Sequence, residues 1–360
     1  MPKTLRIIVW CIVALVLLGI LAFGYTVYMA ESNHIIPQKT GRDTGVIVLA
    51  HGATSQWNSE VERTCCTRLA NAYPTIVVFG MAPAEKTQDA INQLEVLGVQ
   101  RILIVPFLIS SHSELFRQIE YMLKIRTAPD PDYVMAMHTI MQHPFSFALK
   151  KISDIPLKEF FHDAPYTFQM VMDHGKMSHD LQVESRIPLT LLRPLDSHPL
   201  VSGVIEERTR ELSRDPSHES IVLVAHGPLI DADDRAWLGE METLVKPLRS
   251  RFRSVDVATI RDDAKETIKN RAIAELREKV RRGSSDGGRV IIIPLLISRG
   301  GIEREIRNIL SGLNFSYNEM TLLPHQNIER WLLETVEEAD RSPDTAKQLA
   351  HQPLQALSNP

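Results

Sequence analysis

The chain has 360 residues, which is too long for one ordinary core and predicts two domains of common size with some chain left over. Its 44% hydrophobic and 23% charged residues are typical of a globular protein, and a formal net charge of −4 offers no general attraction for phosphate backbones, which excludes nucleic acid as an expected partner. The three cysteines match neither a disulfide framework nor zinc-ligand spacing, so stability is expected to come from burial alone, with Cys65 and Cys66 as buried apolar residues.

Residues 7–29 are almost wholly apolar, and this run is close to the roughly 20 residues that a helix needs to cross a bilayer. Basic residues precede the run and an acidic residue follows it. By the positive-inside rule, this keeps the N-terminus in the cytoplasm and places the rest of the chain on the periplasmic or exterior side. We therefore expect a single-pass signal-anchor over residues 1–30 and a linker over residues 31–44. A cleaved signal peptide, which would release a secreted protein, is the alternative, although the run exceeds the usual apolar length of about 7–15 residues and Tyr28 stands where a small residue is preferred.

Beyond the linker, Val46–Ala50 is a short continuous apolar run typical of a strand buried on both faces of a parallel sheet, and His51-Gly52 follows it at once. Helical and strand-like patterns then alternate. They predict helices over residues 59–72, 86–97 and 113–125, and strands over residues 75–79 and 101–109. This order implies right-handed crossovers and a parallel sheet with helices on both faces, which is an α/β fold.

The same order then restarts. The run over residues 221–225 leads into His226-Gly227, and the run over residues 289–297 (RVIIIPLLI) matches that over 101–109 (RILIVPFLI). Between and after them the pattern predicts helices over residues 237–252, 264–280 and 302–310, and a strand over residues 255–258. We therefore expect two similar domains, each a parallel sheet flanked by helices, over residues 45–212 and 213–340, and a disordered tail over residues 341–360.

The first repeat is longer than the second because of an insertion over about residues 126–187. The insertion mixes methionine and histidine: Met135, Met137, His138, Met141 and His143, and then Met170, Met172, His174, Met177 and His179. Thioether and imidazole groups could capture a soft metal ion. Methionines are also common gap fillers, and packing is the favoured interpretation.

Two histidines follow strands of the first repeat: His51 comes directly after the first strand, and His112 comes just past the run over residues 101–109. Because ligands collect beyond the carboxyl ends of the strands in open α/β sheets, we expect the two imidazoles to converge. They would then bind a divalent ion such as Co²⁺, Fe²⁺, Ni²⁺ or Zn²⁺. Glu114 adds a carboxylate at the same rim.

In the second repeat the position of His112 falls on Gly300 or Gly301. That copy has therefore lost its pair of imidazoles, and His226 is interpreted as structural or accessory. We expect a cleft wide enough for a flat macrocycle in the first repeat, and a second cleft blunted by its glycines.

With these motifs the sequence resembles the class II chelatases, specifically the sirohydrochlorin cobaltochelatase or CbiX-type family in its long two-repeat form. The resemblance rests on Ala-His-Gly at residues 50–52 and 225–227, VPFLISSH at residues 105–112 and LDSHPL at residues 195–200. It implies that His51 and His112 bind the incoming Co²⁺, Fe²⁺ or Ni²⁺ and assist its insertion into a tetrapyrrole.

The insertion also requires a base that removes two pyrrole N–H protons. The His112-Ser113-Glu114 stretch is similar to a His-x-Glu arrangement of protoporphyrin ferrochelatases, which implies that Glu114 accepts protons. Many CbiX-type sequences have a glutamate after the second strand, where this chain has Met81, so the usual acidic helper is absent unless Glu114 or Glu85 replaces it.

The resemblance thus implies a metal chelatase, a lyase of tetrapyrrole or cobalamin biosynthesis that acts on sirohydrochlorin or a related tetrapyrrole. An extracytoplasmic protein that binds a metal or a tetrapyrrole without turnover is the alternative. A duplicated fold kept as a scaffold without metal chemistry is a third interpretation. The sequence predicts no oligomeric state.

Overall fold

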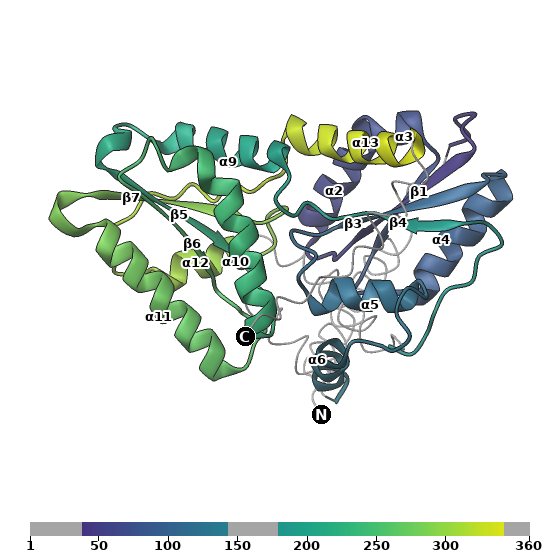
Figure 1. The fold of residues 1–360 in the computed structure, drawn as a ribbon, viewed down its shortest axis with the longest axis horizontal. Coiled ribbons are helices and arrows are strands. Elements are labelled where there is room, and N and C mark those ends of the chain that lie inside the picture. Colours follow the sequence, from purple (N-terminus) through teal and green to yellow (C-terminus); the bar gives the residue numbers. More distant parts are fainter. Residues whose placement is uncertain (1–37, 143–178, 342–360) are drawn as a thin grey trace, which may run out of the picture.

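The computed structural model describes residues 38–142 and 179–341, which form two parallel β-sheets lying side by side with helices packed on them (Figure 1). The predicted α/β fold with parallel sheets flanked by helices is therefore confirmed. The predicted anchor over residues 1–30 and the tail beyond residue 341 lie outside the described residues. None of the described helices is long and apolar enough to span a bilayer.

The first sheet has the strand order β2-β1-β3-β4, and all its strands are parallel. Its strands are β1 (Thr44–Ala50), β2 (Thr75–Phe79), β3 (Arg101–Phe107) and β4 (Leu189–Leu191). Its connecting helices are α2 (Ser55–Thr67), α3 (Leu69–Ala72), α4 (Ala84–Leu97), α5 (Glu114–Met122) and α6 (Pro131–Gln142). Successive side chains of β1 enter different apolar clusters, Val46 and Val48 in one and Ile47 and Leu49 in the other, so both faces of the sheet are covered.

The second sheet has the order β6-β5-β7, again all parallel, with β5 in the place that β1 has in the first sheet. Its strands are β5 (Glu219–Ala225), β6 (Ser254–Thr259) and β7 (Arg289–Leu295). Its helices include α10 (Asp231–Val245), α11 (Glu266–Gly283) and α12 (Ile302–Ile309). The repeat in the sequence is therefore also a repeat of strand order.

Two helices pack on the other half of the molecule instead of on the sheet that they follow in the chain (Figure 1). Helix α9 (Pro199–Leu212) follows the first sheet in the chain but packs against β7 and α10, whereas α13 (Gln326–Arg341) follows the second sheet but packs against β3, α2 and α3. The ring of Trp331 on α13 stacks on Phe107 of β3, with centroids 5.7 Å apart. One apolar cluster consequently runs through both halves, and the division into two separate domains is not confirmed.

Helices α9 and α13 were not predicted, because the residues before their first turns are unusual for a helix start. Helices usually begin at serine, threonine, aspartate or asparagine. Here His198 and His325 take that place, with an imidazole Nδ1 that accepts the backbone N–H of Leu200 at 3.2 Å and of Asn327 at 3.0 Å. Helix α6 and strand β4, which lie within or beside the insertion, were not predicted either.

Three smaller predictions need correction. The predicted helix over residues 59–72 begins earlier, at Ser55, because the side chain of Thr54 caps it, and it is interrupted at Arg68. The predicted strand over residues 101–109 ends at Phe107. Cys65 is buried as expected, but Cys66 is exposed, so the burial predicted for Cys66 is wrong.

Only part of the methionine- and histidine-containing insertion belongs to the described residues. Met137 packs in the core beside the first sheet, as a gap filler would, while Met135 is half exposed on the same helix. The histidines and methionines over residues 143–178 lie outside the described chain, so the metal-capture interpretation of the insertion stays untested.

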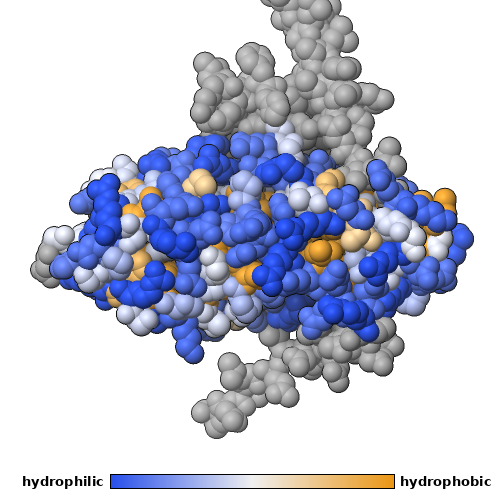
Figure 2. All heavy atoms as spheres, turned by 90° about the horizontal axis from the view of Figure 1, so that it is seen from above, coloured by the Kyte–Doolittle hydropathy of each residue, from blue (hydrophilic) through white to orange (hydrophobic). Residues whose placement is uncertain are grey.

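The molecular surface over the described residues exposes few large apolar side chains, because most of them are buried in the core. The face in Figure 2 is mostly hydrophilic, with apolar residues scattered in small groups. The large apolar side chains that are exposed in the described chain are Val96, Ile125, Met135 and Leu181. Single exposed residues of this kind are normal in soluble domains.

The stacking of Trp331 on Phe107 predicts that Trp331→Ala destabilises the whole molecule. Trp331 is 1% exposed, so its truncation leaves a cavity between the two halves, and we expect the free energy of unfolding to fall by about 3–5 kcal/mol. Urea unfolding followed by circular dichroism measures this. The control is Val96→Ala at a position that is 88% exposed, where we expect a change within about 0.5 kcal/mol. Equal unfolding midpoints for both variants would contradict the shared core.

Candidate functional site

Each half has an Ala-His-Gly turn directly after its inner strand, β1 or β5. The imidazole Nδ1 of His51 lies 2.5 Å from the carbonyl oxygen of Gly52, and that of His226 lies 2.9 Å from the carbonyl oxygen of Gly227. Because a carbonyl oxygen only accepts, Nδ1 carries a proton in each ring. A metal ion bound by either imidazole would therefore be bound through Nε2.

The glycine of the second turn is required by space and by backbone conformation. Gly227 has φ +83°, and a Cβ added there would lie 2.6 Å from the Cβ of Thr259 at the end of β6. No other residue fits without displacing the neighbouring strand. The turn is therefore pressed against the end of β6, close to the residues that follow that strand.

His112 lies on the same edge of the first sheet as His51, because Ala50 of β1 is paired with Phe107 of β3. Its Nε2 lies 3.3 Å from Oε1 of Glu240, which belongs to α10 of the other half. The hydroxyl of Ser110 donates to Oε2 of Glu240 at 2.6 Å. The hydrogen bond to Glu240 raises the pKa of His112, against the opposing effect of burial.

An equivalent contact joins the halves on the other side. Ser298, which follows β7 as Ser110 follows β3, donates its hydroxyl hydrogen to Glu60 on α2. No imidazole accompanies this pair, because Gly300 stands two residues beyond Ser298. The two Ser-Glu contacts bring the carboxyl edges of the two sheets against each other.

Gly300 leaves no room for a counterpart of His112. A Cβ at this position would lie 3.2 Å from the Cβ of Ala53 and 3.3 Å from Cδ1 of Trp57, both of the first half. The loop after β7 is therefore packed closely against the start of α2. The expected second cleft, blunted by its glycines, stays a prediction.

Asp196, from the LDSHPL motif, holds the loop that carries His112. Its Oδ1 accepts the backbone N–H of Ser111 at 2.7 Å, and its Oδ2 accepts Nε of Arg193 at 2.9 Å. Burial, reinforced by the nearby charge of Glu240, raises the pKa of Asp196 to about 6. The LDSHPL motif contributes to the family resemblance, but no role was predicted for Asp196.

Glu114 is the first residue of α5, and its Oε2 is buried without a hydrogen-bond partner in the described chain. Burial and the charge of Asp233 raise its pKa, while the charges of Arg117 and His226 lower it. Arg117 in turn binds Asp233 of α10 through Nη1 at 2.8 Å. Glu114 therefore lies near residues of the second half, and its chief electrostatic partners do not include His112.

Ligand atoms from three metal-binding side chains approach within 4.8 Å of one another at only one place in the described chain, formed by His226, Asp262 and Asp263. The three residues predicted from the first repeat do not form such a group. His51 and His112 share a sheet edge, whereas the charges that act on Glu114 are those of Arg117, Asp233 and His226. Their joint role in metal binding stays a prediction.

Asp262 and Asp263 were not predicted as site residues, although the sequence contains a signal for them. The stretch Thr259-Ile-Arg-Asp-Asp, which starts at the last residue of β6, corresponds to Phe79-Gly-Met-Ala-Pro, which starts at the last residue of β2. Acidic residues that are absent after the second strand of the first repeat are thus present in the second. Burial lowers the pKa of His226, but the hydrogen bond and charge of Asp263, with the charge of Asp262, more than compensate and raise it to about 9.

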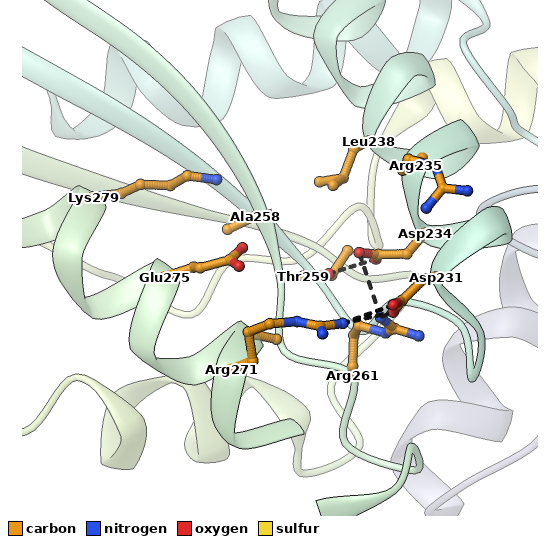
Figure 3. Close-up of a pocket in the computed structure, with 11 residues that line it drawn as sticks. Asp231, Asp234, Arg235, Leu238, Ala258, Thr259, Arg261, Arg271, Glu275 and Lys279 are labelled. Carbon is orange, nitrogen blue, oxygen red and sulfur yellow. Dashed lines mark hydrogen bonds and ion pairs between the residues drawn. The ribbon is translucent and has the colours of Figure 1, made fainter. Parts of the chain in front are cut away.

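The cavities that stand out lie elsewhere. One of about 240 Å³ lies between α10, α11 and β6, and Figure 3 shows Arg261 and Arg271 directed at Asp231 on its wall. Another of about 560 Å³ lies at the amino edge of the first sheet, beside Arg42 and Asp340. Neither is lined by a residue predicted for the site.

The contact between Glu240 and His112 predicts that Glu240→Gln lowers the pKa of His112, because the hydrogen bond that favours the imidazolium loses its negative charge. Since the raised pKa favours the folded state below the ordinary value of 6.5, the stability that this pair adds is present in acid and is lost as the pH rises through the folded-state pKa. Nuclear magnetic resonance titration of the histidine ring protons measures the shift.

Glu242→Gln is the matched control, because Glu242 lies on the same helix but pairs with Arg249. It should leave the His112 titration in place. An unchanged His112 pKa in Glu240→Gln would show that the two halves do not meet at this residue.

The family model of CbiX matches residues 45–212, and no curated protein matches the sequence. SirB from Bacillus subtilis with Fe³⁺ is a solved structure with a TM-score of 0.50 and 13% identity, over 84% of this chain and 97% of that chain. At this identity the likeness shows the fold, and it extends over both halves.

Two further structures have lower scores. DR2241 from Deinococcus radiodurans, described as a multi-domain protein with structural similarity to chelatases, has a TM-score of 0.42 and 15% identity, over 81% of this chain and 54% of that chain. CbiX, described as the terminal enzyme for biosynthesis of siroheme in denitrifying bacteria, has a TM-score of 0.36 and 11% identity, over 82% and 99%. The resemblance carried by the motifs is confirmed to this extent: the family model of CbiX matches the segment over residues 45–212, which contains both His51 and His112.

Proposed function

We propose that the protein inserts a divalent metal ion, its substrate, into a tetrapyrrole, with His51 and His112 as the first ligands of the ion. The observation that carries this proposal is the pair of imidazoles at one sheet edge, in a segment that the family model of CbiX matches. A metal bound by a few neutral imidazoles remains exchangeable, which transfer to a macrocycle requires. The reactions that we propose first are the insertion of Co²⁺ and of Fe²⁺ into sirohydrochlorin. The SirB structure contains Fe³⁺, which supports a test with iron.

The hydrogen bonds of the two rings support different ligand atoms. His51 offers Nε2, because its Nδ1 is bound to the Gly52 carbonyl. His112 directs Nε2 at Glu240, so that Nδ1 is the atom left for a metal. A carboxylate that accepts from the far nitrogen orients a histidine ligand and increases its basicity. Glu240 is thus proposed as a positioning residue supplied by the second half.

Glu114 is proposed as the proton acceptor. Its buried Oε2 has no hydrogen-bond partner in the described chain, and burial raises its pKa, which makes it a stronger base than an exposed carboxylate. Met81 cannot accept a proton, and Glu85 is an exposed residue at the start of α4. Glu114 is therefore the better of the two substitutes for the family's acidic helper.

A second candidate function is the binding of a metal or tetrapyrrole without turnover. Met81 favours it, because the carboxylate that many CbiX-type sequences have at this point is missing. Stoichiometric binding of Co²⁺ or of a tetrapyrrole, with no metallated product, would select it.

We also propose that residues 1–30 anchor the protein in a membrane, with the rest of the chain outside the cytoplasm. The support is the apolar run over residues 7–29 and the charges that flank it. Reaction of Cys66, which is exposed, with an impermeant thiol reagent in intact cells tests the orientation. Labelling only after lysis would contradict it.

Metallation of sirohydrochlorin by the purified protein, followed by absorption spectroscopy with Co²⁺ and with Fe²⁺, tests the proposed function. His51→Ala should abolish the protein-dependent rate, because the ion loses one of its first ligands. Glu114→Gln should lower the rate at least about 100-fold, because general base catalysis typically contributes that much.

His218→Ala is the control, since this exposed histidine pairs with Asp215 and lies outside the proposed site. Its rate should equal that of the unaltered protein. A His51→Ala variant that is as fast as the control would refute the assignment, and a protein-dependent rate of zero in all forms would favour the binding protein.

A further inference from the structure

His226, Asp262 and Asp263 bring one imidazole and two carboxylates together at the carboxyl edge of the second sheet. Their ligand atoms lie within 4.8 Å of one another, and Nε2 of His226 lies 3.3 Å from Oδ2 of Asp263. Two ligands at about 2.1 Å from a tetrahedral ion are about 3.4 Å apart. This pair therefore already has the spacing that a shared ion would require.

The backbone holds the group in place. The carbonyl of Gly227 accepts Nδ1 of His226 at 2.9 Å, which directs Nε2 to the carboxylates. The backbone N–H of Arg261 donates to the carbonyl of His226 at 2.6 Å and so ties the turn with Asp262 and Asp263 to the histidine. Ligands fixed in this way lose little conformational freedom when an ion binds.

The charges around the group favour a cation. The ammonium of Lys269 binds Oδ1 of Asp262 and, at 3.1 Å, Oε1 of Glu305. The three carboxylates of Asp262, Asp263 and Glu305 outnumber this ammonium group. The guanidinium of Arg261 adds no positive charge to the group, because it turns to Asp231 and the carbonyls of residues 228 and 229.

Two further features fit a metal ion. The side chain of Asp263 is 57% exposed and that of His226 is 29% exposed, which leaves space for water ligands. Glu114 of the other half has a buried Oε2 without a hydrogen-bond partner in the described chain, and the charge of His226 lowers the pKa of Glu114. A cation bound at His226 would act on this carboxylate in the same direction.

We propose that His226, Asp262 and Asp263 form a second divalent-cation site, separate from the His51 and His112 edge. The mixed nitrogen and oxygen donors suit first-row ions such as Co²⁺, Zn²⁺ and Fe²⁺. None of these three ligands is assigned to metal insertion, so the site can be tested apart from the proposed function.

Titration of the full chain with Co²⁺ tests the site, with equilibrium dialysis for stoichiometry and the visible absorption of bound Co²⁺ for its surroundings. The starting protein carries His51→Ala and His112→Ala, which removes the edge assigned to insertion. We expect it to bind one Co²⁺ per chain. Adding Asp263→Asn or His226→Gln should weaken that binding at least about tenfold, since the loss of even supporting groups around a metal costs that much.

Asp256→Asn is the matched control, because Asp256 lies on β6 of the same half but pairs with Arg282. It should leave the affinity unchanged. The exposed Asp263→Asn is the variant least able to disturb folding, and its melting temperature without metal verifies this. Failure of the starting protein to bind Co²⁺, or equal affinity in Asp263→Asn, His226→Gln and the control, would overturn the second site. A loss of insertion activity in His51→Ala is a separate result, so the two proposals fail independently.

Discussion

Helices α9 and α13 each pack on the half that holds the other sheet, and this exchange holds the two sheets together at their carboxyl edges. The polar contacts between the halves depend on this exchange of helices. Trp331 of α13 closes the core of the first sheet against Phe107, while α9 packs on the second sheet and α10. A shared apolar core fixes the relative position of the halves more firmly than surface ion pairs do. The meeting of Glu240 with His112 is thus a consequence of distant packing, although the residues themselves lie in loops and helix faces.

The two halves have kept different parts of one set of donors. The first repeat has His51 and His112 but Met81 after its second strand, whereas the second has His226 with Asp262 and Asp263 after its second strand and glycine at the place of His112. Equivalent strand edges therefore carry two imidazoles in one copy and one imidazole with two carboxylates in the other. The same fold can offer different ligand sets without a change of its sheet order.

Much of the fold could be predicted because burial on both faces leaves a plain pattern. Strand β2 has the predicted bounds, and α4 ends where predicted because Gly98, at φ 86°, terminates it in the left-handed conformation. His51 lies at a strand end as expected. Glu240 could not be predicted as the partner of His112, because the two meet only through tertiary packing. The neighbouring contact of Glu240 with Ser110 joins residues that are 130 positions apart. Asp262 could have been found by aligning the ends of the two second strands.

Because α9 and α13 each pack on the other half, the two halves are expected to fold together as one unit. A cut in the exposed stretch over residues 214–218 would separate each sheet from a helix that covers it, because α9 would leave with the first fragment and α13 with the second. Each fragment would then expose the apolar face of its helix and an uncovered part of its own sheet. Reassociation of the two fragments would bury both apolar surfaces again. The segment that was duplicated in the sequence is therefore shorter than the segment that must fold together.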